Sequence, residues 1–139
     1  MSDTFEGGCA CGAIRYKAEG PPRYMGNCHC RDCQQATGSG FFPGVGLKQE
    51  KVTVSGEPKW FTRQADRGHP IHRAFCPDCG SPVMIRNEAS PGFVVFYAGS
   101  LDDPSWFEPA IDIFVKSAVP WVCQNPDSPK FDEMPPRRA

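Results

Sequence analysis

Cys76-Pro77-Asp78-Cys79-Gly80 is the motif on which the predicted fold of this chain most depends. Two cysteines in one tight turn can supply two sulfur ligands to a metal ion, and a structural zinc ion takes four ligands in a tetrahedron. Pro77 stiffens the turn, and Gly80 allows the unusual backbone angles that follow it. The stretch Cys9-Ala10-Cys11 supplies a second pair of thiols. We therefore predict one closed zinc site, which staples an N-terminal hairpin to a later one and consists of Cys9, Cys11, Cys76 and Cys79.

A third cluster, Cys28-His29-Cys30-Arg31-Asp32-Cys33, brings three more thiols together in one short segment. Seven clustered cysteines cannot fill two four-cysteine sites, so Cys28, Cys30 and Cys33 would form a metal site with one open position. Structural zinc sites are closed, whereas catalytic sites keep an exchangeable position. Three thiolates on Zn²⁺ leave a net charge near −1, which disfavours water activation and favours a substrate thiol as fourth ligand. We predict sulfur chemistry at these three candidate catalytic residues.

Other interpretations of the cysteines remain open. Disulfides are disfavoured because Cys-x-Cys closes too small a ring to be a common bridge. A thioredoxin-like redox pair at Cys76 and Cys79 would need a βαβ pattern that is missing. Four-cysteine ligation does not by itself exclude iron. The three-cysteine site is alternatively vacant, or completed by Cys123 or His29. His29 itself is expected to point away from the metal. It would then bind substrate, move a proton, lie at the surface or support the ligands through hydrogen bonds.

The composition predicts a single all-β domain of short strands. The chain has 139 residues, 40% of them hydrophobic, with 10 Phe, 14 Gly and 15 Pro. Scattered Gly and Pro interrupt helices, whereas short β-branched and aromatic runs between them are typical of strands. We expect a zinc-binding domain over residues 1–123 and a proline-rich tail over residues 124–139. Strands are expected at residues 13–16, 40–47, 51–54, 59–61, 71–75, 82–85, 93–97 and 111–115.

One short helix is expected at residues 31–37, where Gly38 would end it. Residues 101–104 are expected to form a turn, because Asp and Pro suit turns. Cys123 is expected to be partly buried beside Trp121. The aromatic residues expected in the core are Phe41, Phe42, Trp60, Phe75, Phe93 and Phe96.

The charge pattern speaks against two classes of partner. The formal net charge is −1, and no Lys/Arg-rich stretch stands out beyond Arg137 and Arg138. Nucleic acids and anionic membranes are therefore not expected as partners. The first six residues lack the charged and apolar regions of a signal peptide, and no apolar run is long enough to cross a bilayer. We expect a cytoplasmic protein, in a compartment that keeps thiols reduced. The oligomeric state is left open.

Taken together, the motifs resemble the glutathione-dependent formaldehyde-activating enzyme family over about residues 5–122. Besides the three cysteine clusters, the resemblance rests on Gly7-Gly8 and Gly12-Ala13-Ile14-Arg15-Tyr16, Gly38-Ser39, Phe75, Ser81-Pro82, Ala98-Gly99-Ser100-Leu101-Asp102-Asp103 and Trp121. The resemblance implies a β-tent fold of short antiparallel strands with two zinc ions. In that family the four-cysteine zinc is structural and the three-cysteine zinc is catalytic, which agrees with the ligand count. Cys123 lies outside the family pattern.

The family resemblance also implies an activity. It is a carbon–sulfur lyase reaction, in which a thiol such as glutathione adds to a small electrophile such as formaldehyde, or leaves it. The alternative is a non-catalytic β-tent that binds a protein partner through two structural zinc ions, and a nucleic-acid-binding zinc ribbon is a distant third. The sequence also contains a cationic run, which comprises Arg63, Arg67, His69, His72 and Arg73. These side chains would either bind the carboxylates of glutathione or form a solvated loop.

Overall fold

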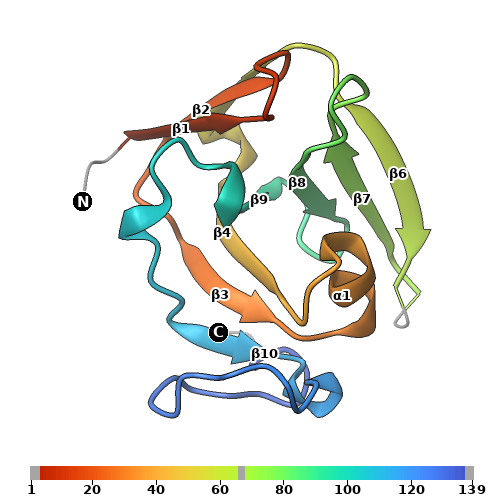
Figure 1. Ribbon diagram of the computed structural model, residues 1–139, viewed down its shortest axis with the longest axis vertical. Coiled ribbons are helices and arrows are strands. Elements are labelled where there is room, and N and C mark those ends of the chain that lie inside the picture. The colour runs from red at the N-terminus through yellow and green to blue at the C-terminus, as the bar shows by residue number, and fades with distance from the viewer. Residues whose placement is uncertain (1–3, 66–67, 137–139) are drawn as a thin grey trace. The chain divides into compact units, whose positions relative to one another are not determined.

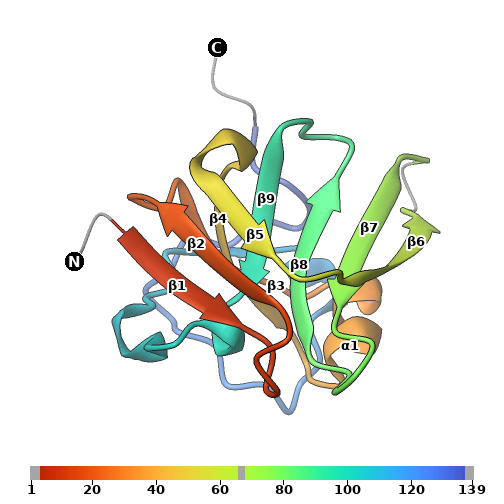
Figure 2. The ribbon, with the colours of Figure 1, turned by 90° about the horizontal axis from the view of Figure 1, so that it is seen from above.

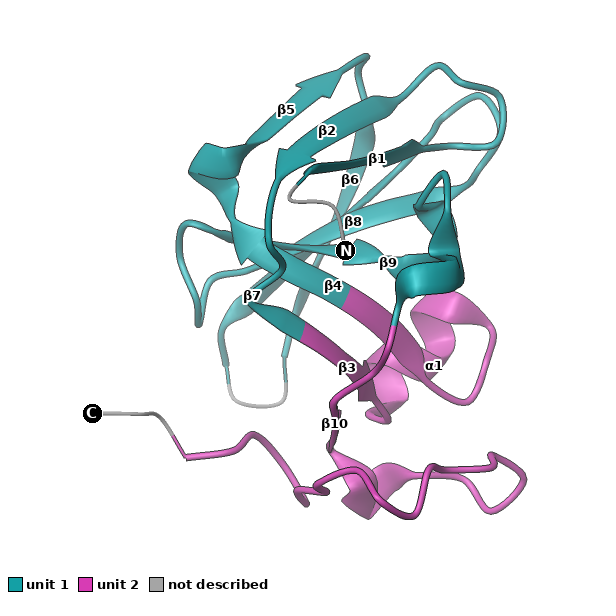
Figure 3. Ribbon diagram, turned by 90° about the vertical axis from the view of Figure 1, so that its left-hand side faces the viewer, with its two compact units in different colours: residues 1–24, 45–107 teal, residues 25–44, 108–139 magenta. Residues whose placement is uncertain are grey.

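Short strands joined by tight turns make up most of the computed structural model, which describes residues 4–65 and 68–136. The mainly β fold with one short helix is therefore confirmed. The chain divides into two compact units (Figure 3). Unit 1 comprises residues 1–24 and 45–107, and unit 2 comprises residues 25–44 and 108–139. Within the described residues, no helix is long and apolar enough to cross a membrane.

Unit 1 contains a three-stranded antiparallel sheet, seen on the left of Figure 2. Its strands, in spatial order, are β1 (Thr4–Gly8), β2 (Arg15–Glu19) and β5 (Val52–Ser55). Burial alternates along β1 and β2, so that one face of this sheet carries the buried side chains Phe5, Tyr16 and Ala18. Alternation of this kind is what a half-buried antiparallel sheet requires.

The second sheet of unit 1 includes three successive antiparallel strands that stand side by side in Figure 1, β6 (Lys59–Gln64), β7 (Pro70–Phe75) and β8 (Pro82–Asn87). β9 (Phe93–Tyr97) follows beside β8, and then β4 (Phe42–Lys48), of which residues 45–48 belong to this unit. Three short 3-10 helices, η1 (Gln49–Lys51), η2 (Ala98–Ser100) and η3 (Pro104–Trp106), connect these elements.

Aromatic side chains form part of the core of unit 1. The rings of Tyr16 and Phe96 stack at 3.9 Å between centroids, and Phe5 meets Phe96 edge-on at 6.2 Å. In unit 2, Phe42 is buried as predicted. The prediction for Trp60 was wrong, because this residue is 37% exposed. Trp60 lies on β6, the last strand of its sheet, where the guanidinium of Arg86 covers its ring at 5.0 Å.

Unit 2 contains the helix, the Cys28, Cys30 and Cys33 motif and a parallel strand pair. β10 (Ile111–Ile113) runs parallel to β3 (Tyr24–Cys28), an exception among otherwise antiparallel pairs with known register. α1 (Arg31–Thr37) has the predicted bounds, and Gly38 ends it in the left-handed conformation with φ 69°. β10 is followed by η4 (Val115–Ser117).

The segment after η4 runs alongside β10, as the magenta chain in Figure 3 shows. The backbone N–H of Asp112 donates to the carbonyl of Pro129, and the carbonyl of Asp112 accepts the N–H of Phe131. The backbone N–H of Phe114 donates to the carbonyl of Glu133. Phe114 adopts φ 56°, a left-handed conformation that costs a non-glycine residue free energy. The proline-rich segment predicted as a tail therefore forms regular hydrogen bonds with unit 2 over residues 129–133.

Candidate metal centres

Four cysteines of unit 1 meet at the ends of two hairpins. Cys9 and Cys11 lie in the turn between β1 and β2, and Cys76 and Cys79 lie in the turn between β7 and β8. Their sulfur atoms all lie within 4.8 Å of one another. The Sγ atoms of Cys9 and Cys11 are 3.7 Å apart, as are those of Cys11 and Cys76. We call these residues the four-cysteine group.

The backbone of each turn explains why its two thiols converge. Gly80 donates its N–H to the carbonyl of Cys76 at 2.8 Å and has φ 76°, a conformation that glycine adopts without strain. This confirms the predicted role of Gly80. In the other turn, the N–H of Ile14 donates to the Sγ of Cys9 at 3.2 Å. Bonds of this kind stabilise the negative charge of a thiolate and so prepare the turn for a cation.

The four thiols perturb one another's ionisation. The hydroxyl of Ser81, 3.2 Å from the Sγ of Cys79, lowers the pKa of Cys79 to about 5. A hydrogen bond from the backbone of Ala13 lowers the pKa of Cys11. Hydrogen bonds with the thiols of Cys76, Cys79 and Cys9 outweigh this effect and raise the pKa to about 12. Thiolates this close repel one another unless a cation lies between them. The group therefore has the electrostatics of a cation site.

Three cysteines of unit 2 form a second cluster. Cys28 ends β3, Cys30 is the N-cap of α1, and Cys33 lies in the first turn of that helix. Their sulfur atoms also lie within 4.8 Å of one another. The N–H of Cys33 donates to the Sγ of Cys30 at 3.3 Å, so the helix start holds two of the three side chains in register. We call these residues the three-cysteine group.

Burial differs among the three thiols. Cys28 and Cys33 are 6% and 4% exposed, whereas Cys30 is half-buried. Hydrogen bonding with Cys30 and Cys33, followed by burial, raises the pKa of the Cys28 thiol. The solvent therefore reaches this group at Cys30.

Both groups fit zinc by the chemistry of their donors. A zinc–sulfur bond of about 2.3 Å in a tetrahedron places two sulfurs about 3.8 Å apart. The separations of 3.7 Å in the four-cysteine group match that value. The three-cysteine group offers three of the four donors that a tetrahedral ion takes. Each group can thus hold a metal ion, and thiolates are ligands that zinc accepts readily.

Neither alternative fourth ligand joins the three-cysteine group among the described residues. The Nε2 of His29 instead bonds to Oδ1 of Asp112 at 2.8 Å. Cys123 is exposed, and Trp121 is 71% exposed, so the expected partial burial of Cys123 beside Trp121 was wrong. Cys123 is therefore a free surface thiol outside both groups.

The predicted cationic run lies on the hairpin of β6 and β7, apart from Arg67, which falls outside the described residues. His72 bonds through Nδ1 to the hydroxyl of Thr62 at 2.7 Å, and its Nε2 lies 3.3 Å from Oε2 of Glu88. Arg73 donates to the hydroxyl of Tyr97 at 3.2 Å. These contacts occupy the side chains within unit 1, and the binding of glutathione by this run stays a prediction.

Sequence reasoning overlooked residues that support the two groups. Ser81 accepts the N–H of Ala10 at 3.1 Å and so joins the two turns of the four-cysteine group. Asp112 and Gln34 are buried polar residues that bond to His29. A serine directly after a Cys-x-x-Cys-Gly turn is a local signal for the first of these. Asp112 has no such signal, because 83 positions separate it from His29.

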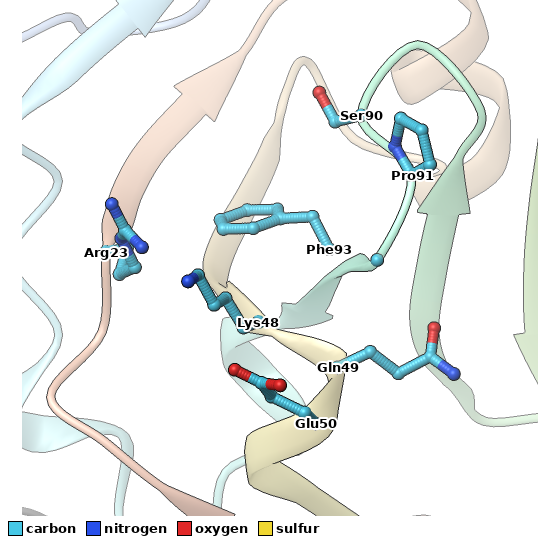
Figure 4. Close-up of a pocket in the computed structure, with 8 residues that line it drawn as sticks. Arg23, Lys48, Gln49, Glu50, Ser90, Pro91 and Phe93 are labelled. Carbon is cyan, nitrogen blue, oxygen red and sulfur yellow. The ribbon is translucent and has the colours of Figure 1, made fainter.

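Unit 1 has a surface hollow of about 830 Å³, and no cysteine lines it (Figure 4). Arg23, Lys48 and Glu50 border it, and the ring of Phe93 forms part of its wall. Because none of its lining residues is a cysteine, the hollow is not part of either candidate metal centre.

Comparison with known proteins defines the class of this chain. Residues 4–117 match the family model described as glutathione-dependent formaldehyde-activating enzyme. The chain belongs to this family. A Halomonas elongata protein, provisionally named glutathione-dependent formaldehyde-activating enzyme, is 27% identical over 124 residues, which cover 85% of this chain and 79% of that protein. A crystal structure of a Rhodobacter sphaeroides protein has the same fold, with a TM-score of 0.55, 14% identity and coverage of 91% of this chain and 98% of the other.

Proposed function

We propose that this protein is a zinc-dependent enzyme of the carbon–sulfur lyase type, which joins a thiol such as glutathione to a small aldehyde such as formaldehyde, or separates them. The family description and the name of the Halomonas elongata relative support this reaction. One structural observation carries it. A complete four-cysteine group and an incomplete three-cysteine group coexist in one chain.

The two groups have different roles in the proposal. The four-cysteine group supplies every ligand that a tetrahedral zinc ion needs, so it acts as a structural centre that holds two hairpin turns together. The three-cysteine group leaves one ligand position for an exchangeable partner. Cys28, Cys30 and Cys33 are therefore the catalytic ligands in this proposal, and the zinc that they hold is the labile one.

Zinc bound by Cys28, Cys30 and Cys33 would supply Lewis acidity that favours the thiolate form of a substrate thiol near neutral pH. The residues themselves provide orientation. Cys28 and Cys33 are buried, so half-buried Cys30 marks the accessible side of the group. Glutathione would approach from that side.

The proposed addition needs no oxidant or reductant. The thiol sulfur loses its proton and forms a bond to the carbonyl carbon of the aldehyde. The carbon–oxygen π bond breaks, and the oxygen takes up a proton to become a hydroxyl group. The reverse reaction breaks the carbon–sulfur bond and returns thiol and aldehyde. Neither direction requires a nucleic acid or a membrane, and the reduced cytoplasm remains the expected compartment.

Metal analysis tests the proposed division of the two centres. The purified protein is expected to contain two zinc ions, of which a mild chelator removes one. Glutathione at millimolar concentration should slow that removal, because it would add the missing sulfur ligand. Two ions that both resist the chelator, with no effect of glutathione, would favour the alternative of a non-catalytic β-tent that binds a protein partner.

Activity tests the reaction itself. The exchange of ¹³C-formaldehyde with glutathione, followed by NMR, should be faster with the protein than without it. Cys30→Ser should abolish this acceleration and remove the labile zinc. Cys123→Ser is the matched control, because Cys123 is an exposed cysteine outside both groups. We would abandon the proposal if Cys30→Ser kept full zinc content and full activity on every thiol–aldehyde pair tested.

A further inference from the structure

His29 stands between two cysteines of the three-cysteine group, and its imidazole lies inside unit 2. The side chain is 1% exposed, and its Nε2 bonds to Oδ1 of Asp112 at 2.8 Å. Because the acceptor is a carboxylate, Nε2 carries the proton of this bond. Nδ1 is buried and has no hydrogen-bond partner within the described part of the chain. The ring is therefore held from one side by a single carboxylate.

The backbone of His29 is held by the same part of unit 2. Its N–H donates to the carbonyl of Ile113 at 3.0 Å, and its carbonyl accepts the side-chain amide of Gln34 at 2.9 Å. The same amide donates to the carbonyl of Ser117 at 3.0 Å. The side chain and the backbone of His29, which links Cys28 to Cys30, are thus both held by hydrogen bonds in the part of unit 2 that contains β10 and η4.

Asp112 is in turn held by the chain that follows η4. Its Oδ2 accepts the hydroxyl of Ser128 and the ammonium of Lys130, the latter at 3.1 Å. Burial raises the pKa of Asp112, but the bonds from His29, Ser128 and Lys130 outweigh it and lower this pKa. Lys130 also bonds to the carbonyl of Asn125 at 2.6 Å, which closes the loop over residues 125–130 around the carboxylate.

From these contacts we propose that His29 and Asp112 are positioning residues of the three-cysteine group. Residues 125–131, which we call the clamp, hold Asp112 in place and so raise the metal affinity of the group. The proposal rests on the metal binding proposed above. It assigns a role to the C-terminal segment, which lies outside residues 4–117 matched by the family model.

Preorganisation of the three sulfur atoms would cause this effect. Three thiolates bind an ion more tightly when their sulfurs already stand at ligand distances, because ordering them at the moment of binding costs conformational free energy. His29 connects two of these ligands, so rotation of its backbone would move both sulfurs. In other metal sites, removal of a residue that hydrogen-bonds to a metal ligand typically lowers metal affinity about 10- to 100-fold. We expect a loss in that range for His29→Ala.

The four-cysteine group provides an internal reference for the test. Its ligands belong to unit 1, and its outer partners are Ser81 and turn backbone rather than a histidine. Metal-free protein is titrated with Co²⁺ without oxygen, and Zn²⁺ competition then gives an affinity for each group. The thiolate–cobalt absorption bands report the ligand geometry at the weaker group. None of these measurements depends on enzymatic activity.

The variants separate positioning from general stability. His29→Ala should weaken the three-cysteine group at least tenfold and leave the four-cysteine group within about twofold. His29→Gln should restore part of the affinity, because its amide can donate to Asp112. Lys130→Met and Ser128→Ala change half-buried or exposed side chains, so they should fold and weaken the same group at least threefold. His72→Ala is the matched control, because His72 also pairs with a carboxylate, Glu88, but lies in unit 1.

Three results would overturn the proposal. Affinities of the three-cysteine group within twofold of wild type in both His29→Ala and Lys130→Met would show that the clamp has no effect, while the proposed function would stand. Parallel losses at both groups would show a role in folding alone. A wild-type protein that binds only one Co²⁺ would remove the proposed function together with this inference.

Discussion

Cys11 Sγ and Cys76 Sγ lie 3.7 Å apart, although 65 positions separate the two residues in the chain. The contact joins the turn between β1 and β2 to the turn between β7 and β8. No hydrophobic packing is needed to explain it, because two sulfurs at this distance match adjacent ligands of a tetrahedral zinc ion. The stability of unit 1 should therefore depend on metal.

Cys76→Ser tests this dependence. Cys76 is completely buried, and its loss should remove the tightly held zinc and lower the free energy of unfolding by more than about 3 kcal/mol, since the binding free energy of structural zinc contributes directly to folding. Thermal unfolding followed by circular dichroism, together with metal analysis, measures both effects. Cys123→Ser should change neither. A Cys76→Ser protein with wild-type melting temperature would contradict the structural assignment.

Ser81→Ala should weaken the four-cysteine group without unfolding unit 1. The substitution removes the hydroxyl that lies 3.2 Å from the Sγ of Cys79 and accepts the N–H of Ala10. A loss of about tenfold in zinc affinity is expected, which is typical of an outer partner of a metal ligand. Competition with a chromophoric chelator gives the affinity. Ser105→Ala is the control, because its hydroxyl donates to nearby Asp103 and the residue lies outside both cysteine groups.

The ion pair of Arg15 and Asp102 predicts a pH dependence. Arg15 donates to both carboxylate oxygens, at 2.8 and 2.5 Å, and holds the pKa of Asp102 below its usual range. A carboxyl whose pKa is lower in the folded state stabilises the fold above the unfolded value of about 3.9, and this contribution is lost as the pH falls. The pair is solvent-exposed, so the contribution at pH 7 should not exceed about 1 kcal/mol.

A double-mutant cycle isolates this pair. Zinc release also changes stability in acid, but it affects all four proteins of the cycle formed by Asp102→Asn and Arg15→Gln alike. The coupling energy should be measurable at pH 7 and should decline as the pH falls below about 3.9 towards the lowered pKa of Asp102. A coupling energy that stays constant as the pH falls through this range would argue against the carboxylate as its source.

Gly7→Ala should destabilise unit 1 by about 1–3 kcal/mol or more, through overpacking. A Cβ at this position would lie 2.3 Å from the backbone oxygen of Ser100 and 2.3 Å from the hydroxyl of Tyr16. A backbone atom cannot move aside as a flexible side chain can. Gly99→Ala is the matched control, because a Cβ there meets nothing within 4 Å. Urea unfolding of the zinc-loaded proteins compares the two, and equal midpoints would contradict the prediction.

Some elements followed directly from local sequence. α1 has the predicted bounds, since polar residues fill it and Gly38 ends it in the conformation that glycine favours. β3 was not predicted, because Gly26 and Asn27 in its interior conceal the pattern of a strand. Trp60 was misplaced in the core because local hydrophobicity does not reveal which strand ends a sheet.

The two cysteine groups could be predicted from the sequence, because spacing within a turn decides which thiols can share an ion, and the count of seven leaves one group incomplete. The residues that surround these groups could not be predicted, because they come from distant parts of the chain. Ser81 beside Cys79, Asp112 on His29 and Lys130 on Asp112 are contacts that depend on how distant turns and strands come together. Buried polar groups must find hydrogen-bond partners, but which partner each one finds is set by packing across the whole unit.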